Sequence, residues 1–135
     1  MKKYHFLLLI ALFLVGCQSK PISGEEVSVD GGSYKNVTPK ELNTLLKNKD
    51  FVFINVHIPF AGNIASTDLS IAYDQIEQNL SQLPSDKNAK IVLYCRSGHM
   101  SKIAAEKLVS LGYTNVWNLN GGMTEWEKEG FTLEK

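Results

Sequence analysis

The sequence has very few cysteines, only Cys17 and Cys95 among 135 residues, and the contexts of the two differ completely. Such a pair matches neither a disulfide framework nor a zinc-ligand pattern. An excess of basic residues is also missing, since 14 Lys and Arg balance 14 Asp and Glu, so the charge indicates no nucleic-acid partner. Internal repeats and low-complexity tracts are absent as well. A chain of this length with 44% hydrophobic residues is therefore expected to form one domain with a real core.

The chain begins with a charged start and an unbroken apolar run, Phe6–Val15, which is too short to span a bilayer as a mature helix. This pattern is typical of a secretory signal peptide, here residues 1–16. The run ends in Leu14-Val15-Gly16-Cys17, which resembles a bacterial lipobox. The resemblance implies cleavage before Cys17, diacylglycerol on its sulfur and acylation of the new N-terminus, for example with palmitate. Two or more acyl chains anchor stably, so the domain is expected on a membrane of the cell envelope, outside the cytoplasm. A generic signal peptide that happens to contain a cysteine is the alternative.

The segment that follows, Gln18–Ser33, is polar and contains Gly, Ser and Pro. This composition is typical of a flexible tether. We therefore expect the lipidated Cys17 and its tether over residues 17–33 and a single domain over 34–135, with the fold beginning near Tyr34.

Apolar periodicity alternates between strand and helix patterns from there on. Helices are expected at Pro39–Lys47, Asp74–Leu83, Ser101–Leu111 and Met123–Lys128, and strands at Phe51–Val56, Leu69–Tyr73, Ile91–Tyr94 and Asn115–Leu119. The first helix has the strongest start signal, a capping box over Thr38–Glu41 with Pro39 at the first helical position. The alternation predicts an α/β domain with a mainly parallel central sheet flanked by helices.

The clearest functional signal is the loop between Ile91–Tyr94 and the helix that follows, Cys95-Arg96-Ser97-Gly98-His99-Met100. An abrupt strand-to-helix turn leaves backbone N–H groups without partners, and these point into the turn. Such donors and the helix dipole favour a thiolate, so we expect a lowered thiol pKa and a nucleophilic sulfur at Cys95. His99 would help to lower this pKa. The alternative is that Cys95 is a small buried hydrophobe at the end of a strand.

The loop and its surroundings resemble the rhodanese (sulfurtransferase) domain over roughly residues 36–131. Three features carry the resemblance: Cys95–Ser101, similar to the family loop; Ile54–His57 followed by Gly62–Ile64, in the place of Asp-Val-Arg and Gly-His-Ile; and Val116–Gly122 followed by Trp126 and Gly130. The resemblance implies a single rhodanese-like domain in which Cys95 takes sulfane sulfur from a donor and holds it as a persulfide.

The implied reaction has two steps, since a thiol or cyanide acceptor then removes the sulfur. Loop N–H groups from about Arg96 to Ser101, including those of Ser97, Gly98, His99 and Met100, would stabilise the charged terminal sulfur. Arg96 would fix the loop or screen the incoming anion, and Ser101 would cap the following helix and donate to the thiolate side. No cofactor and no metal ion is expected.

Several positions depart from the family pattern. Met100 stands where the family usually has Arg, which removes a charged donor for an oxyanion such as thiosulfate. An uncharged Met100 suits an organic persulfide or a protein donor better. Asn55 and His57 replace an ion-pairing Asp and Arg, while Asn63 replaces a His and Ala65 a Pro.

Three other functions remain open from the sequence. A cysteine phosphatase or arsenate reductase would need a loop Arg that neither Met100 nor Ser101 supplies. A metal or redox module would bring Cys95, His99 and His57 together as ligands, at spacings that match no closed site. A non-catalytic lipoprotein domain would use the same scaffold to bind a partner or a sulfur species.

Overall fold

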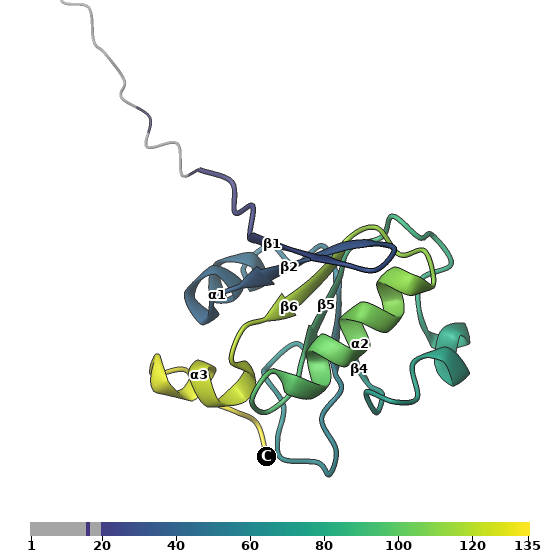
Figure 1. The fold of residues 1–135 in the computed structure, drawn as a ribbon. Coiled ribbons are helices and arrows are strands. Elements are labelled where there is room, and N and C mark those ends of the chain that lie inside the picture. The colour runs from purple at the N-terminus through teal and green to yellow at the C-terminus, as the bar shows by residue number, and fades with distance from the viewer. Residues whose placement is uncertain (1–15, 17–19) are drawn as a thin grey trace, which may run out of the picture.

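A computed structural model of the chain describes Gly16 and residues 20–135, and its centre is one twisted sheet (Figure 1). Six strands follow the order β1-β2-β6-β5-β3-β4, and every pairing is parallel except that of β1 with β2. The strands are β1 (Glu25–Val29), β2 (Gly32–Val37), β3 (Val52–Asn55), β4 (Leu69–Ser70), β5 (Ile91–Tyr94) and β6 (Val116–Leu119). The predicted single α/β domain with a mainly parallel sheet is therefore confirmed.

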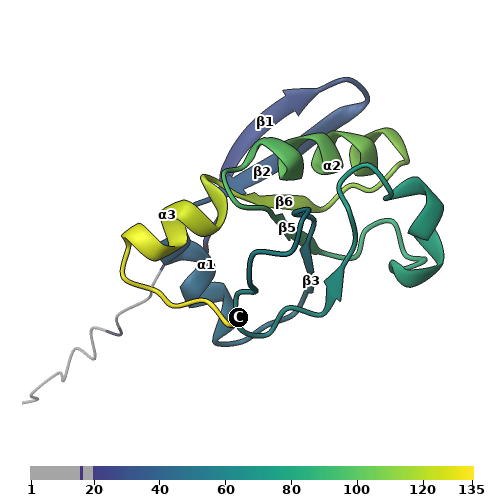
Figure 2. The same cartoon turned by 90° about the horizontal axis from the view of Figure 1, so that it is seen from below.

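Helices cover both faces of this sheet (Figure 2). They are α1 (Pro39–Leu46), the 3₁₀ helix η1 (Glu77–Gln82), α2 (His99–Ser110) and α3 (Gly122–Lys128). One apolar layer lies between the sheet and α2, and includes Leu93 and Leu108. The other lies between the sheet and the pair α1 and α3, and includes Leu42 and Trp126. All four residues of β5 are buried between these two layers, so the carboxyl end of this strand is packed from both sides.

The fold begins earlier than the sequence analysis placed it. Residues 25–33 belong to the β1–β2 hairpin, so the expected tether over 17–33 is too long, and the start near Tyr34 is wrong. The two-residue turn Asp30-Gly31 is a local hairpin signal, and Gly31 takes the left-handed conformation (φ 88°) that the turn uses. The hairpin is retained because β2 pairs with β6 in the sheet. The expected signal peptide and the lipidated Cys17 lie outside the described residues, apart from Gly16.

The capping box before α1 is confirmed, but the helix expected over Asp74–Leu83 is wrong. That segment forms only η1, and Asn79 inside it has non-helical backbone angles (φ −117°, ψ 23°). Its side-chain amide donates to the Gln75 carbonyl at 2.7 Å, so a side chain competes with the backbone for the helical acceptor. Elsewhere the expected elements are present with ends shifted by a few residues. Within the described residues, no helix has the length and apolar character needed to cross a membrane.

Asp68 attaches the start of β4 to the sheet through an ion pair and a backbone contact. Its Oδ2 lies 2.6 Å from Lys49 Nζ and accepts from the Phe53 N–H at 2.8 Å. Burial alone raises the pKa of Asp68, but the hydrogen bonds from Lys49 and from the Phe53 N–H outweigh it, and the pKa lies below its ordinary value.

We expect Asp68→Asn to lower the free energy of unfolding at pH 7, by less than about 1 kcal/mol because the pair is partly exposed. The folded-state pKa is depressed, so the contribution of Asp68 is full above pH 3.8 and is lost as the pH falls through the lower folded value. Urea unfolding of both proteins between pH 2 and 7 measures this difference, with Glu127→Gln as an exposed control. A difference between wild type and variant that stays constant down to the lowest pH would contradict the assignment.

Candidate active site

The residues singled out in the sequence meet at the carboxyl edge of the parallel sheet, where β5 leads into α2 (Figure 1). Helix α2 begins at His99, two residues before the expected start. Gly98 is its N-cap and has a left-handed backbone (φ 102°, ψ −15°) that only glycine adopts without strain. The chain therefore turns within Cys95–Gly98, and the whole predicted loop lies at the N-terminus of one twelve-residue helix.

The Cys95 sulfur lies beneath this turn rather than open to solvent, with 1% of the residue exposed. The Gly98 N–H donates to Sγ at 3.0 Å. The thiol in turn faces Ser101 Oγ at 3.4 Å, and that hydroxyl donates to the Gly98 carbonyl at 3.2 Å. The sulfur thus belongs to the apolar layer under α2 on one side and has polar partners on the other.

The sequence predicts several N–H donors around the sulfur, but among the described residues only the Gly98 N–H donates to it. The first backbone N–H groups of α2, those of His99, Met100 and Ser101, have no acceptor among the described residues. These are the orphan donors of a helix N-terminus, and they lie in the same turn as the sulfur. The loop therefore has donors left over for an anion that extends beyond Sγ.

Of the two roles predicted for Ser101, the structure has the contact with the sulfur but not the helix cap. Ser101 is the third residue of α2 and is fully buried, and no side chain caps the helix at Gly98. Its hydroxyl instead links the sulfur to the Gly98 carbonyl. The side chains of Arg96, Ser97 and His99 are exposed, whereas Met100 is half-buried and packs on the apolar layer under α2.

A second glycine turn, Gly121-Gly122 at the start of α3, supports the loop from the other side. The N–H groups of Met123 and Thr124 donate to the carbonyls of Cys95 and Arg96, both at 2.9 Å. A Cβ on Gly122 would collide with the Cys95 carbonyl oxygen and lie 2.8 Å from the Arg96 carbonyl carbon. The family resemblance included this Gly-Gly pair, which is the one local signal of the turn, but the contact with the Cys95 loop was not predicted.

The loop that leaves β3 is closed by neutral hydrogen bonds in place of an ion pair. The buried Asn55 amide donates to the Gly62 carbonyl and to Asn63 Oδ1, both at 2.9 Å. Its own carbonyl oxygen accepts from the His57 N–H at 3.0 Å. Burial lowers the pKa of His57, and the nearby charge of Arg96 lowers it further, so His57 favours its neutral form beside the loop.

Tyr94, which sequence reasoning missed, anchors the same loop from below. Its fully buried hydroxyl accepts from the Ile64 N–H at 3.0 Å and lies 2.7 Å from the Thr67 hydroxyl. Burial raises the pKa of Tyr94. The phenol therefore stays neutral, and its hydrogen bonds hold the loop after β3 against the residue that precedes Cys95.

Neither rival chemistry gains support from this arrangement. Within Gly16 and residues 20–135, no group of three or more His, Cys, Asp or Glu side chains could hold a metal ion, so Cys95, His99 and His57 do not form one. Arg96 is the only arginine in the chain, and its side chain is exposed immediately after the cysteine. A phosphate-binding arginine on the far side of the loop is missing.

Comparisons with known proteins agree with the fold and with the loop. The family profile described as the rhodanese-like domain matches residues 38–129. A sulfurtransferase of Allochromatium vinosum is 30% identical over 91 residues, which cover 66% of this chain and 83% of that protein. An adenylyltransferase and sulfurtransferase, UBA4, of Candida albicans is 33% identical over 103 residues, which cover 69% of this chain but only 23% of the yeast protein.

A solved structure extends the similarity to the backbone. The rhodanese-like domain protein of Staphylococcus aureus superposes with a TM-score of 0.61 at 28% identity, over 75% of this chain and 99% of that one. The match to the family profile includes the Cys95 loop and the strands β3 to β6. The chain belongs to the rhodanese-like family of sulfurtransferases.

Proposed function

We propose that this protein is a membrane-anchored sulfurtransferase that acts outside the cytoplasm and carries sulfane sulfur as a persulfide on Cys95. The observation that carries the proposal is the position of Sγ, held by the Gly98 N–H in a turn whose next three N–H groups have no acceptor among the described residues. Hydrogen bonds to a charged group stabilise it, so these N–H groups would stabilise the charged terminal sulfur of a persulfide.

The two steps balance in atoms and charge. The Cys95 thiolate attacks the sulfane sulfur of the donor, a new S–S bond forms, and the donor's bond to that sulfur breaks and leaves sulfite or a thiolate. The terminal sulfur of the persulfide then carries the negative charge, which the free N–H groups of His99, Met100 and Ser101 stabilise. A thiolate or cyanide acceptor attacks this sulfur, and the Cys95 thiolate is regenerated.

The test is intact-mass spectrometry of the full chain after incubation with thiosulfate or with a low-molecular-weight persulfide. We expect the mass of one added sulfur atom, its removal by cyanide, and no addition to Cys95→Ser. The absence of an adduct with every donor would sink the proposal. It would favour the alternative, a non-catalytic domain that binds a partner, for which the 1% exposure of Cys95 is the supporting observation.

Donor preference follows from the side chains around the loop. Met100 is half-buried and provides no charge for an oxyanion. An uncharged side chain at this position favours an organic persulfide or a protein donor over thiosulfate.

We expect Met100→Arg to raise the rate with thiosulfate about tenfold to hundredfold, since a charge-assisted hydrogen bond contributes about 1.5–3 kcal/mol. Steady-state assays with thiosulfate and cyanide measure this, and Met100→Gln, which is polar but uncharged, is the matched control. An equal gain in both variants, or none in either, would show that charge at this position does not limit thiosulfate use.

Membrane attachment rests on the lipobox resemblance at Leu14–Cys17. We expect Cys17→Ser to move the protein out of the membrane fraction of its host and to abolish incorporation of labelled palmitate. Unchanged fractionation with no label in the wild type would leave the sulfur chemistry intact and remove only the anchor.

A further inference from the structure

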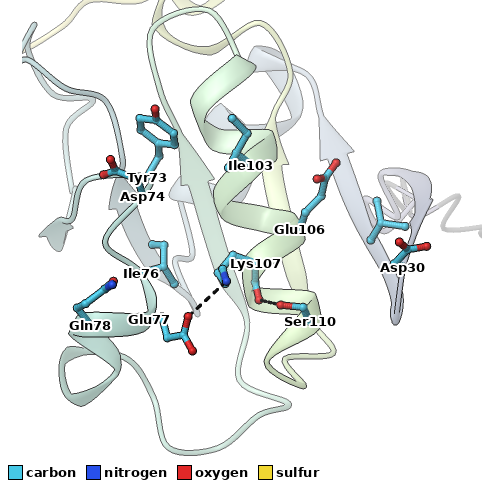
Figure 3. A pocket seen from close by; sticks show the side chains of 11 residues that line it. Asp30, Tyr73, Asp74, Ile76, Glu77, Gln78, Ile103, Glu106, Lys107 and Ser110 are labelled. Carbon is cyan, nitrogen blue, oxygen red and sulfur yellow. Dashed lines mark hydrogen bonds and ion pairs between the residues drawn. The ribbon is translucent and has the colours of Figure 1, made fainter.

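A hollow on the described part of the chain lies over the outer face of α2, apart from the Cys95 loop (Figure 3). Its volume is about 740 Å³, and none of the residues from Cys95 to Ser101 lines it. The helix between Ile103 and Ser110 forms the floor, the segment 73–78 forms one side, and the hairpin tip at Asp30 lies on the other. We call this hollow the α2 groove.

The α2 groove combines apolar surface with unbalanced negative charge. Ile103 points into it and is one of the few large apolar side chains exposed on the described residues, at 39%. Tyr73 and the buried Ile76 add apolar surface from the opposite side. Four carboxylates line the groove against one ammonium group, a formal charge of −3, in a chain whose total is zero.

The negative charge is not neutralised within the molecule. Lys107, the one cation, pairs with Glu77 at 3.3 Å. The other three carboxylates, those of Asp30, Asp74 and Glu106, take part in no ion pair among the described residues. The charge of Glu106 also acts on Tyr34, since burial raises the pKa of Tyr34 and the Glu106 carboxylate raises it further.

We propose that the α2 groove binds a polypeptide segment of a partner protein in which Lys or Arg side chains flank apolar ones. Charge complementarity selects a cationic partner, and the exposed Ile103 favours one with apolar side chains. The unpaired carboxylates of Asp74 and Asp30 lie on opposite sides of α2, that of Asp74 near the end of the groove that holds Ile103 (Figure 3). A single small cation meets only one of them, whereas an extended chain reaches all of them along the roughly 10 Å of helix between Ile103 and Ser110.

This binding does not depend on the sulfur chemistry, since the groove and the Cys95 loop share no lining residue. The two are nevertheless neighbours, because Ile103 lies four residues, about one helical turn, beyond the start of α2 at His99. A partner seated in the groove would therefore extend toward the reactive loop.

The test is fluorescence anisotropy of the full chain with a short fluorescein-labelled peptide in which lysines flank leucines. We expect the combined Asp30→Asn, Asp74→Asn and Glu106→Gln variant to bind roughly tenfold more weakly at low salt, since each partly exposed ion pair contributes modestly. The matched control is the combined Glu25→Gln, Glu26→Gln and Glu127→Gln variant, which changes the total charge equally at exposed residues outside the groove. It should bind like the wild type, and so should Cys95→Ser.

Two further measurements separate the apolar part from the charge. Ile103→Ser should weaken the peptide roughly fivefold, and a peptide with serine in place of leucine should bind the wild type as weakly. The proposal is overturned if the control variant loses as much affinity as the groove variant, or if the serine peptide binds as well as the leucine peptide. Displacement of the peptide by equimolar spermidine would overturn it as well, because the groove would then select any polycation.

Discussion

Replacing Gly122 with alanine is expected to lower the free energy of unfolding by about 4 kcal/mol and to abolish sulfur transfer. Gly122 has φ 59°, a left-handed angle that costs a residue with a Cβ about 1–2 kcal/mol. The new Cβ would also collide with the Cys95 carbonyl oxygen, and relief of such overpacking costs about 1–3 kcal/mol. The atoms that must move are the backbone of the reactive turn itself.

Gly112→Ala provides the matched control for this prediction. Gly112 also has a left-handed backbone (φ 93°), but a Cβ there meets nothing within 4 Å. This variant should lose only the backbone contribution, about 1–2 kcal/mol, and keep its sulfur transfer. Urea unfolding and the persulfide mass assay measure both quantities. Equal losses in the two variants would mean that contact with the Cys95 loop adds nothing at Gly122.

The second large effect is expected at Asn55, where aspartate should destabilise the fold by about 3 kcal/mol at pH 7. The carboxylate keeps the shape of the amide but loses the N–H groups that donate to the Gly62 carbonyl and to Asn63 Oδ1. One buried and one partly buried acceptor would then face a negative charge, and an unsatisfied buried group costs about 1–3 kcal/mol. Crowding by acceptors raises the pKa of the new carboxyl group, so stability should partly return as the pH falls through that value.

Asn43→Asp is the control for Asn55→Asp, because Asn43 lies on α1 and its side chain makes no hydrogen bond with the part of the chain that the structure describes. Its free energy of unfolding should change by less than about 0.5 kcal/mol. Chemical denaturation from pH 4 to 7 separates the two variants. A loss of similar size at both positions would show that the neutral network around Asn55 does not stabilise the loop after β3.

Features encoded within a few residues of one another were predictable. The capping box joins Thr38 to Glu41 across a single turn, and both of its hydrogen bonds are present. The strand Ile91–Tyr94 was placed correctly because an uninterrupted apolar run there is followed at once by polar and permissive residues. The β1–β2 hairpin was missed although its Asp30-Gly31 signal is equally local, because the surrounding composition was assigned to a tether.

The reactive loop was predictable as a motif but not as a geometry. The sequence indicated which residues form it, from Cys95 to Ser101, because the cysteine, the glycine and the polar residues follow one another in the chain. It indicated both a cap and a contact with the sulfur for Ser101, and only the structure showed that the contact with the sulfur is made without the cap. The sequence also did not indicate how deeply the sulfur is buried.

The chain alone thus determined the α/β class, the family resemblance and the candidate nucleophile Cys95, all of which depend on local patterns. The tertiary structure decided what meets across the sheet: Gly122 against the Cys95 carbonyl, Asn55 against Gly62, and the carboxylates around the α2 groove. The physical reason is range. Caps, turns and apolar periods are short-range properties of the backbone, whereas a steric contact or an unbalanced charge depends on which distant segments the folded sheet brings together.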